Sequence, residues 1–140
     1  MKLTCFLHKK EKTIVIQPFG RSSTMGPGIV FDTSTRSIEQ ATFIELVGEL
    51  SKDYNIMYMG EHKLDVVNLP LFQPTEQIPL RVWAAIIESS DYFIGCDSVG
   101  QHLAYSFDKP GTILCGSTFP INTTYPEHFN IIEKKNAVRT

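Results

Sequence analysis

The residues best suited to chemistry lie in the segment Asp97–Ala104, which reads DSVGQHLA. It follows an apolar, strand-like run that ends at Cys96, and it opens a helix-like run. The first backbone N–H groups of a helix have no acceptor inside the helix, so they bind anions such as phosphate. We therefore expect Ser98 and the N–H groups of Val99 and Gly100 to receive a diphosphate, with Gly100 allowing close approach.

Two more side chains of this segment fit a sugar nucleotide. His102 can donate a hydrogen bond to a phosphate or to a sugar hydroxyl. Asp97 would repel a phosphate, but its carboxylate accepts hydrogen bonds from the hydroxyls of a sugar or a ribose. A purely structural alternative stays open, because Asp97 and Ser98 are also preferred helix N-cap residues.

A second polar set lies in the long irregular stretch from Pro18 to Ser37. Ser22 and Ser23 lie beside Arg21, and Arg36 stands among hydroxyl residues just before the next helical pattern. An arginine guanidinium is a good planar partner for phosphate oxygens. Of the two arginines, Arg36 is favoured as a ligand contact, with solvated surface arginines as the alternative.

A third polar set, Gly60-Glu61-His62, follows another strand-like run. A carboxylate at the carboxyl end of a strand commonly binds a ribose diol, so Glu61 is a candidate for that role, with a solvated turn as the alternative. The sequence contains no G-x-S-x-G, Walker A, G-x-G-x-x-G or H-E-x-x-H motif. The predicted site therefore binds and polarises a ligand without an obvious general base or metal.

Alternating strand and helix patterns indicate how these sets are positioned. Helical spacing of apolar residues appears over Phe43–Leu50, Leu80–Ile87 and Leu103–Phe107, and Ser37 with Gln40 has the spacing of a capping box. Short apolar runs predict strands at Thr13–Gln17, Asn55–Met59, Val66–Leu69, Tyr92–Cys96, Thr112–Cys115 and Phe129–Ile132. The alternation predicts an α/β fold with one doubly wound, Rossmann-like parallel sheet. In such a fold the three polar sets meet at the carboxyl edge of the sheet.

The composition is consistent with one domain spanning residues 1–140, with 1–12 as a lead-in and 18–37 as a loop at the active edge. The formal net charge of −2 gives no basic field for nucleic acid. No run reaches transmembrane length and no signal peptide is apparent, so a cytoplasmic location is expected. The cysteines Cys5, Cys96 and Cys115 form no metal-binding pattern, and the last two look like core residues.

Taken together, these segments resemble the C-terminal, nucleotide-sugar-binding half of the ADP-heptose:lipopolysaccharide heptosyltransferases (glycosyltransferase family nine, GT-B architecture). The likeness runs from about Thr13 to Pro126. IVIQPFG resembles the opening strand and turn of that half, RSIEQATFIELVGEL the basic residue and helix that follow, and NIMYMGEHK the second strand. The run from IPLRVW to GSTFP resembles the family's helix, strand, D-[ST]-G-x-x-H-L-A turn, KP pair and G-x-T-x-P ending. Val99 stands where the family usually has glycine.

The resemblance implies a role for each candidate residue. The diphosphate and sugar would contact Ser22 or Ser23 and Arg36, while Glu61 would bind the ribose. Asp97 would bind the sugar, the Ser98 and Val99 N–H groups the diphosphate, and His102 the phosphate or sugar.

The resemblance further implies an inverting, metal-independent transferase with a nucleoside-diphosphate sugar as donor, ADP-heptose being the candidate. The acceptor site and the carboxylate base would lie in a second Rossmann-like half, in cis or in trans. This chain would then hold no catalytic residue and be inactive alone. Its cleft side would pair with that half, or with itself, through residues such as Phe19, Phe31 or Phe119. A stand-alone nucleotide-binding module is the alternative, and an epimerase or hydrolase of nucleotide sugars a more distant one.

Overall fold

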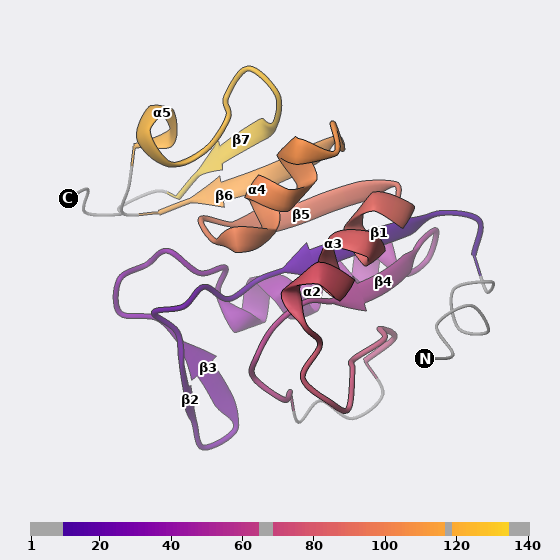
Figure 1. Ribbon diagram of the computed structural model, residues 1–140. Coiled ribbons are helices and arrows are strands. Elements are labelled where there is room, and N and C mark those ends of the chain that lie inside the picture. The colour runs from indigo at the N-terminus through magenta and orange to yellow at the C-terminus, as the bar shows by residue number, and fades with distance from the viewer. Residues whose placement is uncertain (1–9, 65–68, 117–118, 135–140) are drawn as a thin grey trace.

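The strand β1 lies inside the sheet, between β4 and β5. The computed structural model describes residues 10–64, 69–116 and 119–134. In it, five parallel strands lie in the order β4-β1-β5-β6-β7 (Figure 1). The strands are β1 (Thr13–Gln17), β4 (Asn55–Tyr58), β5 (Tyr92–Cys96), β6 (Gly111–Cys115) and β7 (Asn130–Glu133). All five end at one edge, which is the carboxyl edge where ligands of α/β proteins bind.

Helices cover both faces of this sheet. The helix α2 (Gln40–Leu50) packs on one face, and α3 (Leu80–Ser89) and α4 (Val99–Ser106) pack on the other. Successive strand residues point to opposite faces, so Ile14 joins the core on the α2 side and Val15 the core on the other side. The predicted Rossmann-like α/β arrangement is confirmed.

The predicted elements match the observed ones to within one or two residues at five of the six strands. The sixth, Val66–Leu69, falls mostly outside the described residues, as do Cys5 in the predicted lead-in and Thr118 in the G-x-T-x-P segment. A short helix, α5 (Pro120–Thr123), lies between β6 and β7 and was not predicted.

The stretch from 18 to 37 is less irregular than expected. It contains an antiparallel hairpin of β2 (Thr24–Gly26) and β3 (Ile29–Phe31), which projects from the carboxyl edge (Figure 1). Gly28 adopts a positive φ of 73°, a conformation that glycine accepts without strain. The Gly26-Pro27-Gly28 turn therefore joins two strands.

The predicted capping box of α2 is wrong. The Ser37 hydroxyl donates to Asp32 Oδ2 at 2.6 Å and accepts the Gly20 N–H at 2.9 Å. Gln40, which begins the helix, accepts the Val30 N–H at 2.6 Å through its side chain. Both side chains therefore hold the loop and the hairpin, and no side chain caps α2.

Candidate functional site

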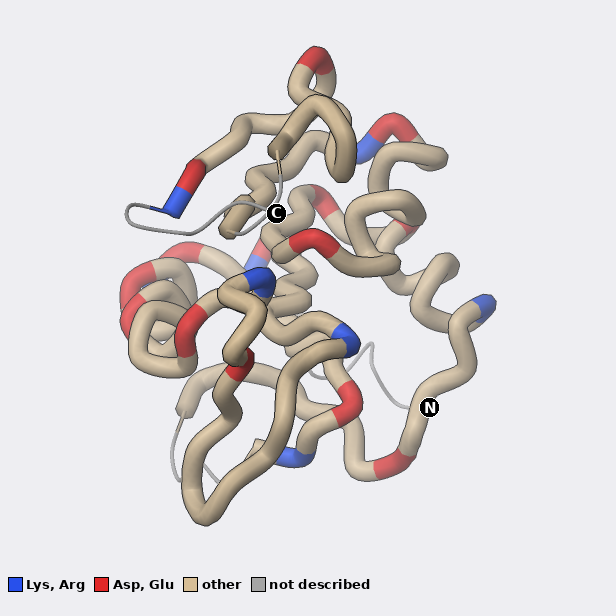
Figure 2. The backbone as a smooth tube through the Cα atoms, turned by 90° about the vertical axis from the view of Figure 1, so that its left-hand side faces the viewer, with Lys and Arg blue, Asp and Glu red and all other residues tan. Residues whose placement is uncertain are grey.

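The three polar loops do meet at the carboxyl edge. Ser23, in the loop after β1, lies 2.8 Å from Nε2 of His62, in the loop after β4. On the other side of the same loop, Gly20 approaches the Asp97 carbonyl at the end of β5 closely enough that an added Cβ would lie 3.7 Å away. In a view toward this edge, Asp and Glu positions are interspersed with Lys and Arg positions (Figure 2).

The first turn of α4 is bound by a side chain from β1. Ser98 is the N-cap residue, but its hydroxyl makes no cap bond. Instead, Gln17 Oε1 accepts the Gly100 N–H at 2.9 Å, and Gln17 Nε2 donates to Ser98 Oγ at 3.4 Å. The Gly100 N–H is thus already satisfied, which corrects the expectation that it is free for a diphosphate. The Val99 N–H, one residue earlier, has no acceptor within its helix.

Gly100 is required by packing. A Cβ at this position would lie 2.6 Å from both Gln17 Oε1 and the ring of Phe93. Gly100 is buried, so its missing side chain lets α4 approach the sheet closely. This corrects the expectation that Gly100 opens the helix start to a ligand. Val99, which is 38% exposed, is the residue that faces outward there.

Asp97 is held in place by the helix that follows it. Its Oδ1 accepts a hydrogen bond from Gln101 Nε2 at 3.2 Å, and the same nitrogen donates to the Thr123 carbonyl at 2.7 Å. Gln101 is fully buried, and its Oε1 has no partner among the described residues. The half-buried Asp97 carboxylate thus has a fixed position just before the first turn of α4.

Asp32 organises the loop that carries the predicted serines. Its carboxylate accepts hydrogen bonds from the hydroxyls of Ser22, Ser34 and Ser37 at 2.9, 2.5 and 2.6 Å. Partial burial acts to raise the pKa of Asp32, but the bonds from Ser34, Ser37 and Ser22 outweigh it and lower the pKa to about 2. Ser22 is therefore engaged by Asp32, a residue that the sequence analysis missed.

Ser23 and His62 form a hydroxyl–imidazole pair, a geometry found in nucleophilic sites. The Ser23 hydroxyl, however, donates its proton to the Gly20 carbonyl at 2.5 Å. With that proton committed, His62 Nε2 must donate to Ser23 Oγ, so the imidazole does not act as a base toward this hydroxyl. The pair ties two loops together and positions Ser23.

Glu61 and Arg36 are both exposed, and no described contact joins them. Glu61 lies next to Tyr58, whose hydroxyl donates to the His62 carbonyl at 2.7 Å. Burial, and then the Glu61 charge, raise the pKa of Tyr58 above its ordinary value. Arg36 has no hydrogen-bond or ion-pair partner in the described part of the chain, so its guanidinium is available to an anionic ligand.

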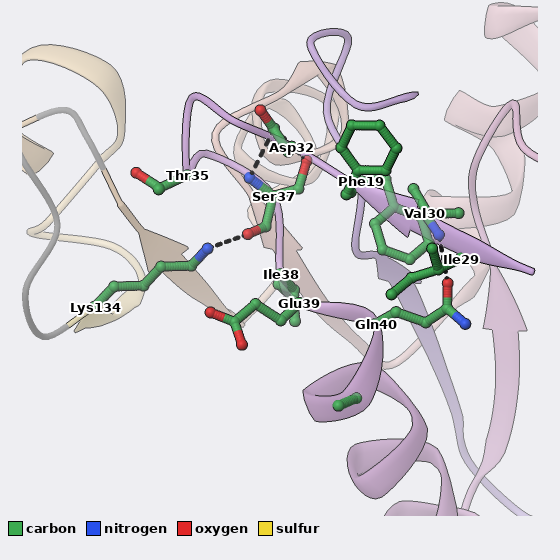
Figure 3. A pocket seen from close by; sticks show the side chains of 12 residues that line it. Phe19, Ile29, Val30, Asp32, Thr35, Ser37, Ile38, Glu39, Gln40 and Lys134 are labelled. Atoms are coloured by element: carbon green, nitrogen blue, oxygen red, sulfur yellow. Dashed lines mark hydrogen bonds between the residues drawn. The ribbon is translucent and has the colours of Figure 1, made fainter. Parts of the chain in front are cut away.

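A cavity of about 300 Å³ lies between the hairpin and the start of α2 (Figure 3). Its walls combine apolar side chains such as Phe19 and Val30 with Asp32 and Lys134. The Lys134 ammonium group, at the end of β7, donates to the Ser37 carbonyl. Phe19 is buried here, contrary to the expectation of an exposed contact.

His102 is exposed and is joined to a residue that the sequence analysis did not single out. Its Nδ1 lies 2.7 Å from the hydroxyl of Tyr125, in the segment that follows α5. No described contact links His102 to Asp97 or to the loop after β1. The site therefore has its fixed centre at Gln17 and Asp97, with His102 and Arg36 placed independently around it.

The fold of this chain has counterparts among solved structures. E. coli heptosyltransferase WaaC with ADP aligns with a TM-score of 0.65 at 14% sequence identity, over 93% of this chain. The chain folds like part of a heptosyltransferase. A second WaaC structure, with ADP-2-deoxy-2-fluoro heptose, aligns with a TM-score of 0.62 at 15% identity over 92% of this chain. The predicted resemblance to heptosyltransferases is thus confirmed at the level of the fold.

A third similar structure is the iron-containing dodecameric glycosyltransferase TibC of enterotoxigenic E. coli, with a TM-score of 0.61 at 15% identity over 91% of this chain. The chain spans 41% and 40% of the two WaaC chains and 33% of the TibC chain. No family model and no curated protein matches the sequence.

Two further observations concern the described residues alone. They contain no group of three His, Cys, Asp or Glu side chains that could hold a metal ion. None of their helices has the length and apolarity that a membrane crossing requires.

Proposed function

We propose that this chain is the donor-binding domain of a heptosyltransferase-like inverting glycosyltransferase and binds a nucleoside-diphosphate sugar at its carboxyl edge. The observation that carries the proposal is the WaaC-like fold with Asp97, Ser98 and the start of α4 at that edge. WaaC was solved with ADP and with an ADP-sugar. These structures support an ADP-sugar as the donor, and ADP-heptose as the first candidate.

The chemistry assigned to this chain is stabilisation of the leaving group. As the sugar departs, negative charge builds on the diphosphate, where Arg36, His102 and the positive end of α4 would bind it. The Asp97 carboxylate would accept hydrogen bonds from sugar hydroxyls, and Glu61 from the ribose. The acceptor and its base would belong to a second Rossmann-like domain, in cis or in trans, so the chain alone binds the donor without transferring the sugar.

A second candidate is a nucleotide-binding module without catalysis. The exposed Val99 side chain at the first helical position favours it, because it narrows the approach of a diphosphate to the backbone. The two candidates share one binding site and differ in turnover. Sugar transfer measured with a partner domain present separates them.

Calorimetry and thermal unfolding with ADP, UDP, GDP and their sugars test both candidates. A ligand at 100 times its Kd should stabilise the chain by about 2.7 kcal/mol. Arg36→Gln should weaken binding. Lys52→Gln is the matched control, because Lys52 follows the C-terminal end of α2, at the opposite edge of the sheet, and should leave affinity unchanged. If no nucleotide shifts the unfolding temperature, both candidates fail. Sugar transfer by the purified chain alone would refute the proposal that the acceptor and its base belong to a second domain.

A further inference from the structure

Tyr125 contacts two residues of α4 at once. Its hydroxyl lies 2.7 Å from His102 Nδ1, with the two rings nearly perpendicular at 86°. Its ring stacks on Tyr105, one turn further along the helix, with centroids 3.7 Å apart and planes 4° apart. Tyr125 thus reaches one residue through a hydrogen bond and the other through stacking.

The position of Tyr125 is fixed by a buried aromatic neighbour and by a hydrogen bond to the backbone just before it. Its ring makes an edge contact with the buried Phe129, with centroids 6.1 Å apart. The segment just before it is tied to α4 by the bond from Gln101 to the Thr123 carbonyl. A hydroxyl held by stacking, by a buried neighbour and by its own backbone is a preorganised partner for His102.

This contact determines what the rest of the His102 ring can do. A neutral imidazole carries one N–H donor and one acceptor nitrogen, and the hydrogen bond at one nitrogen selects the tautomer. A phenol is the stronger donor of this pair and an imidazole nitrogen the stronger acceptor. With Nδ1 accepting from Tyr125, the proton resides on Nε2. Side chains on a helix lean toward its N-terminus, which places His102 beside the first turn of α4.

We propose that Tyr125 is a positioning residue that donates to His102 Nδ1 and holds this histidine as the Nε2–H tautomer, a donor for the phosphate or sugar oxygen of a nucleotide ligand. The inference rests on the proposed function for the identity of the ligand. The contact with Tyr125 and the tautomer are properties of the unliganded chain. They can therefore be measured without any nucleotide.

Long-range 1H–15N NMR spectra at a pH where histidines are neutral test the tautomer. The signals of His102 are those lost in His102→Ala. In the wild type they should show Nε2 protonated, and in Tyr125→Phe, which keeps the ring and removes the hydroxyl, they should shift toward a mixture of tautomers. Tyr105→Phe is the control, because it keeps the stacked ring and the Tyr125 hydroxyl, and it should leave the His102 spectrum unchanged. A wild-type Nδ1–H tautomer, or a Tyr125→Phe spectrum equal to the wild type, overturns the proposal.

Titration with ADP then tests the consequence. Loss of the hydrogen bond should weaken ADP binding about two- to tenfold in Tyr125→Phe. The double variant with His102→Ala should bind no more weakly than His102→Ala alone, because Tyr125 acts through that residue. If ADP binds and Tyr125→Phe binds it equally well, this inference fails while the proposed function stands. If no nucleoside diphosphate binds to any variant, the proposed function fails and the ligand role of His102 fails with it.

Discussion

Gln17, the last residue of β1, accepts a hydrogen bond from the N–H of Gly100 in the first turn of α4, at 2.9 Å. A side chain of β1 thus caps α4, the helix that follows β5. The same amide donates to Ser98 Oγ, so Gln17 holds the two residues on either side of Val99 at the candidate anion site.

Replacement of Gln17 should separate its structural role from its effect on a ligand. Gln17→Leu leaves the buried Gly100 N–H without an acceptor and should lower the free energy of unfolding by about 1–3 kcal/mol. Gln17→Glu retains an acceptor and should keep most of the stability, but its charge should weaken ADP binding. Urea unfolding and ADP titration measure the two effects. Equal or tighter ADP binding by Gln17→Glu would contradict a diphosphate at this helix start.

Gly100 and Gly48 form a matched pair for alanine substitution. A Cβ at Gly100 would meet Gln17 and the Phe93 ring at 2.6 Å, so Gly100→Ala should destabilise the fold by about 1–3 kcal/mol. Gly48 is exposed within α2 and has no atom within 4 Å of an added Cβ. Gly48→Ala should therefore stabilise by about 0.5–1 kcal/mol. Thermal or chemical unfolding of both variants is the measurement, and a neutral Gly100→Ala would show that α4 packs less closely than described.

Asp32 should make the chain less stable in acid. Its pKa is lowered from 3.8 to about 2 in the folded state, so its carboxylate stabilises the fold above about pH 4, and this contribution is lost as the pH falls toward 2. Asp32 is only partly buried and solvent screens its charge, so we expect this contribution to be about 1 kcal/mol. Asp32→Asn should lose this contribution at pH 7, so its stability and that of the wild type should converge near pH 2. A constant difference across this range in urea unfolding would disprove the assignment.

Cys96 and Cys115 should resist thiol reagents while the chain is folded. Both are fully buried, and burial, followed by the nearby Asp97 charge, raises the pKa of Cys96 to about 12. The reactive thiolate is therefore scarce at neutral pH. With Cys5→Ser as the background, Ellman's reagent should label neither cysteine until denaturant is added. Rapid labelling of the folded protein would contradict the burial of these thiols.

The sequence predicted the strands and helices well because their apolar patterns are local. The unbroken run of Thr13–Gln17 indicates a strand buried on both faces, and the helical spacing in Leu80–Ile87 reflects one buried face of α3. The hairpin was harder to predict, since each of its strands has only three residues and both Ile29 and Phe31 are exposed. Its one clear signal is the Gly-Pro-Gly turn.

The candidate site was predicted in outline, and its contacts were not. Ser37 has the spacing of a helix cap, but its hydroxyl donates to the Asp32 carboxylate and does not cap the helix. A polar residue ending an apolar strand, as Gln17 does, was a signal that could have been used. The pairing of His102 with Tyr125 joins segments with no shared local pattern, so it becomes visible only in the folded chain.

The position of β1 between two later strands also affects how the chain folds. β1 pairs with β4 through Ile14 and Ile56 and with β5 through Ile14 and Tyr92, and both partner strands follow it in the sequence. Neither edge of β1 is covered until much later segments have been made. Such non-local pairing slows folding and leaves strand edges open to association with other chains. We expect refolding yield to fall as protein concentration rises, and early truncations that end before β5 to aggregate.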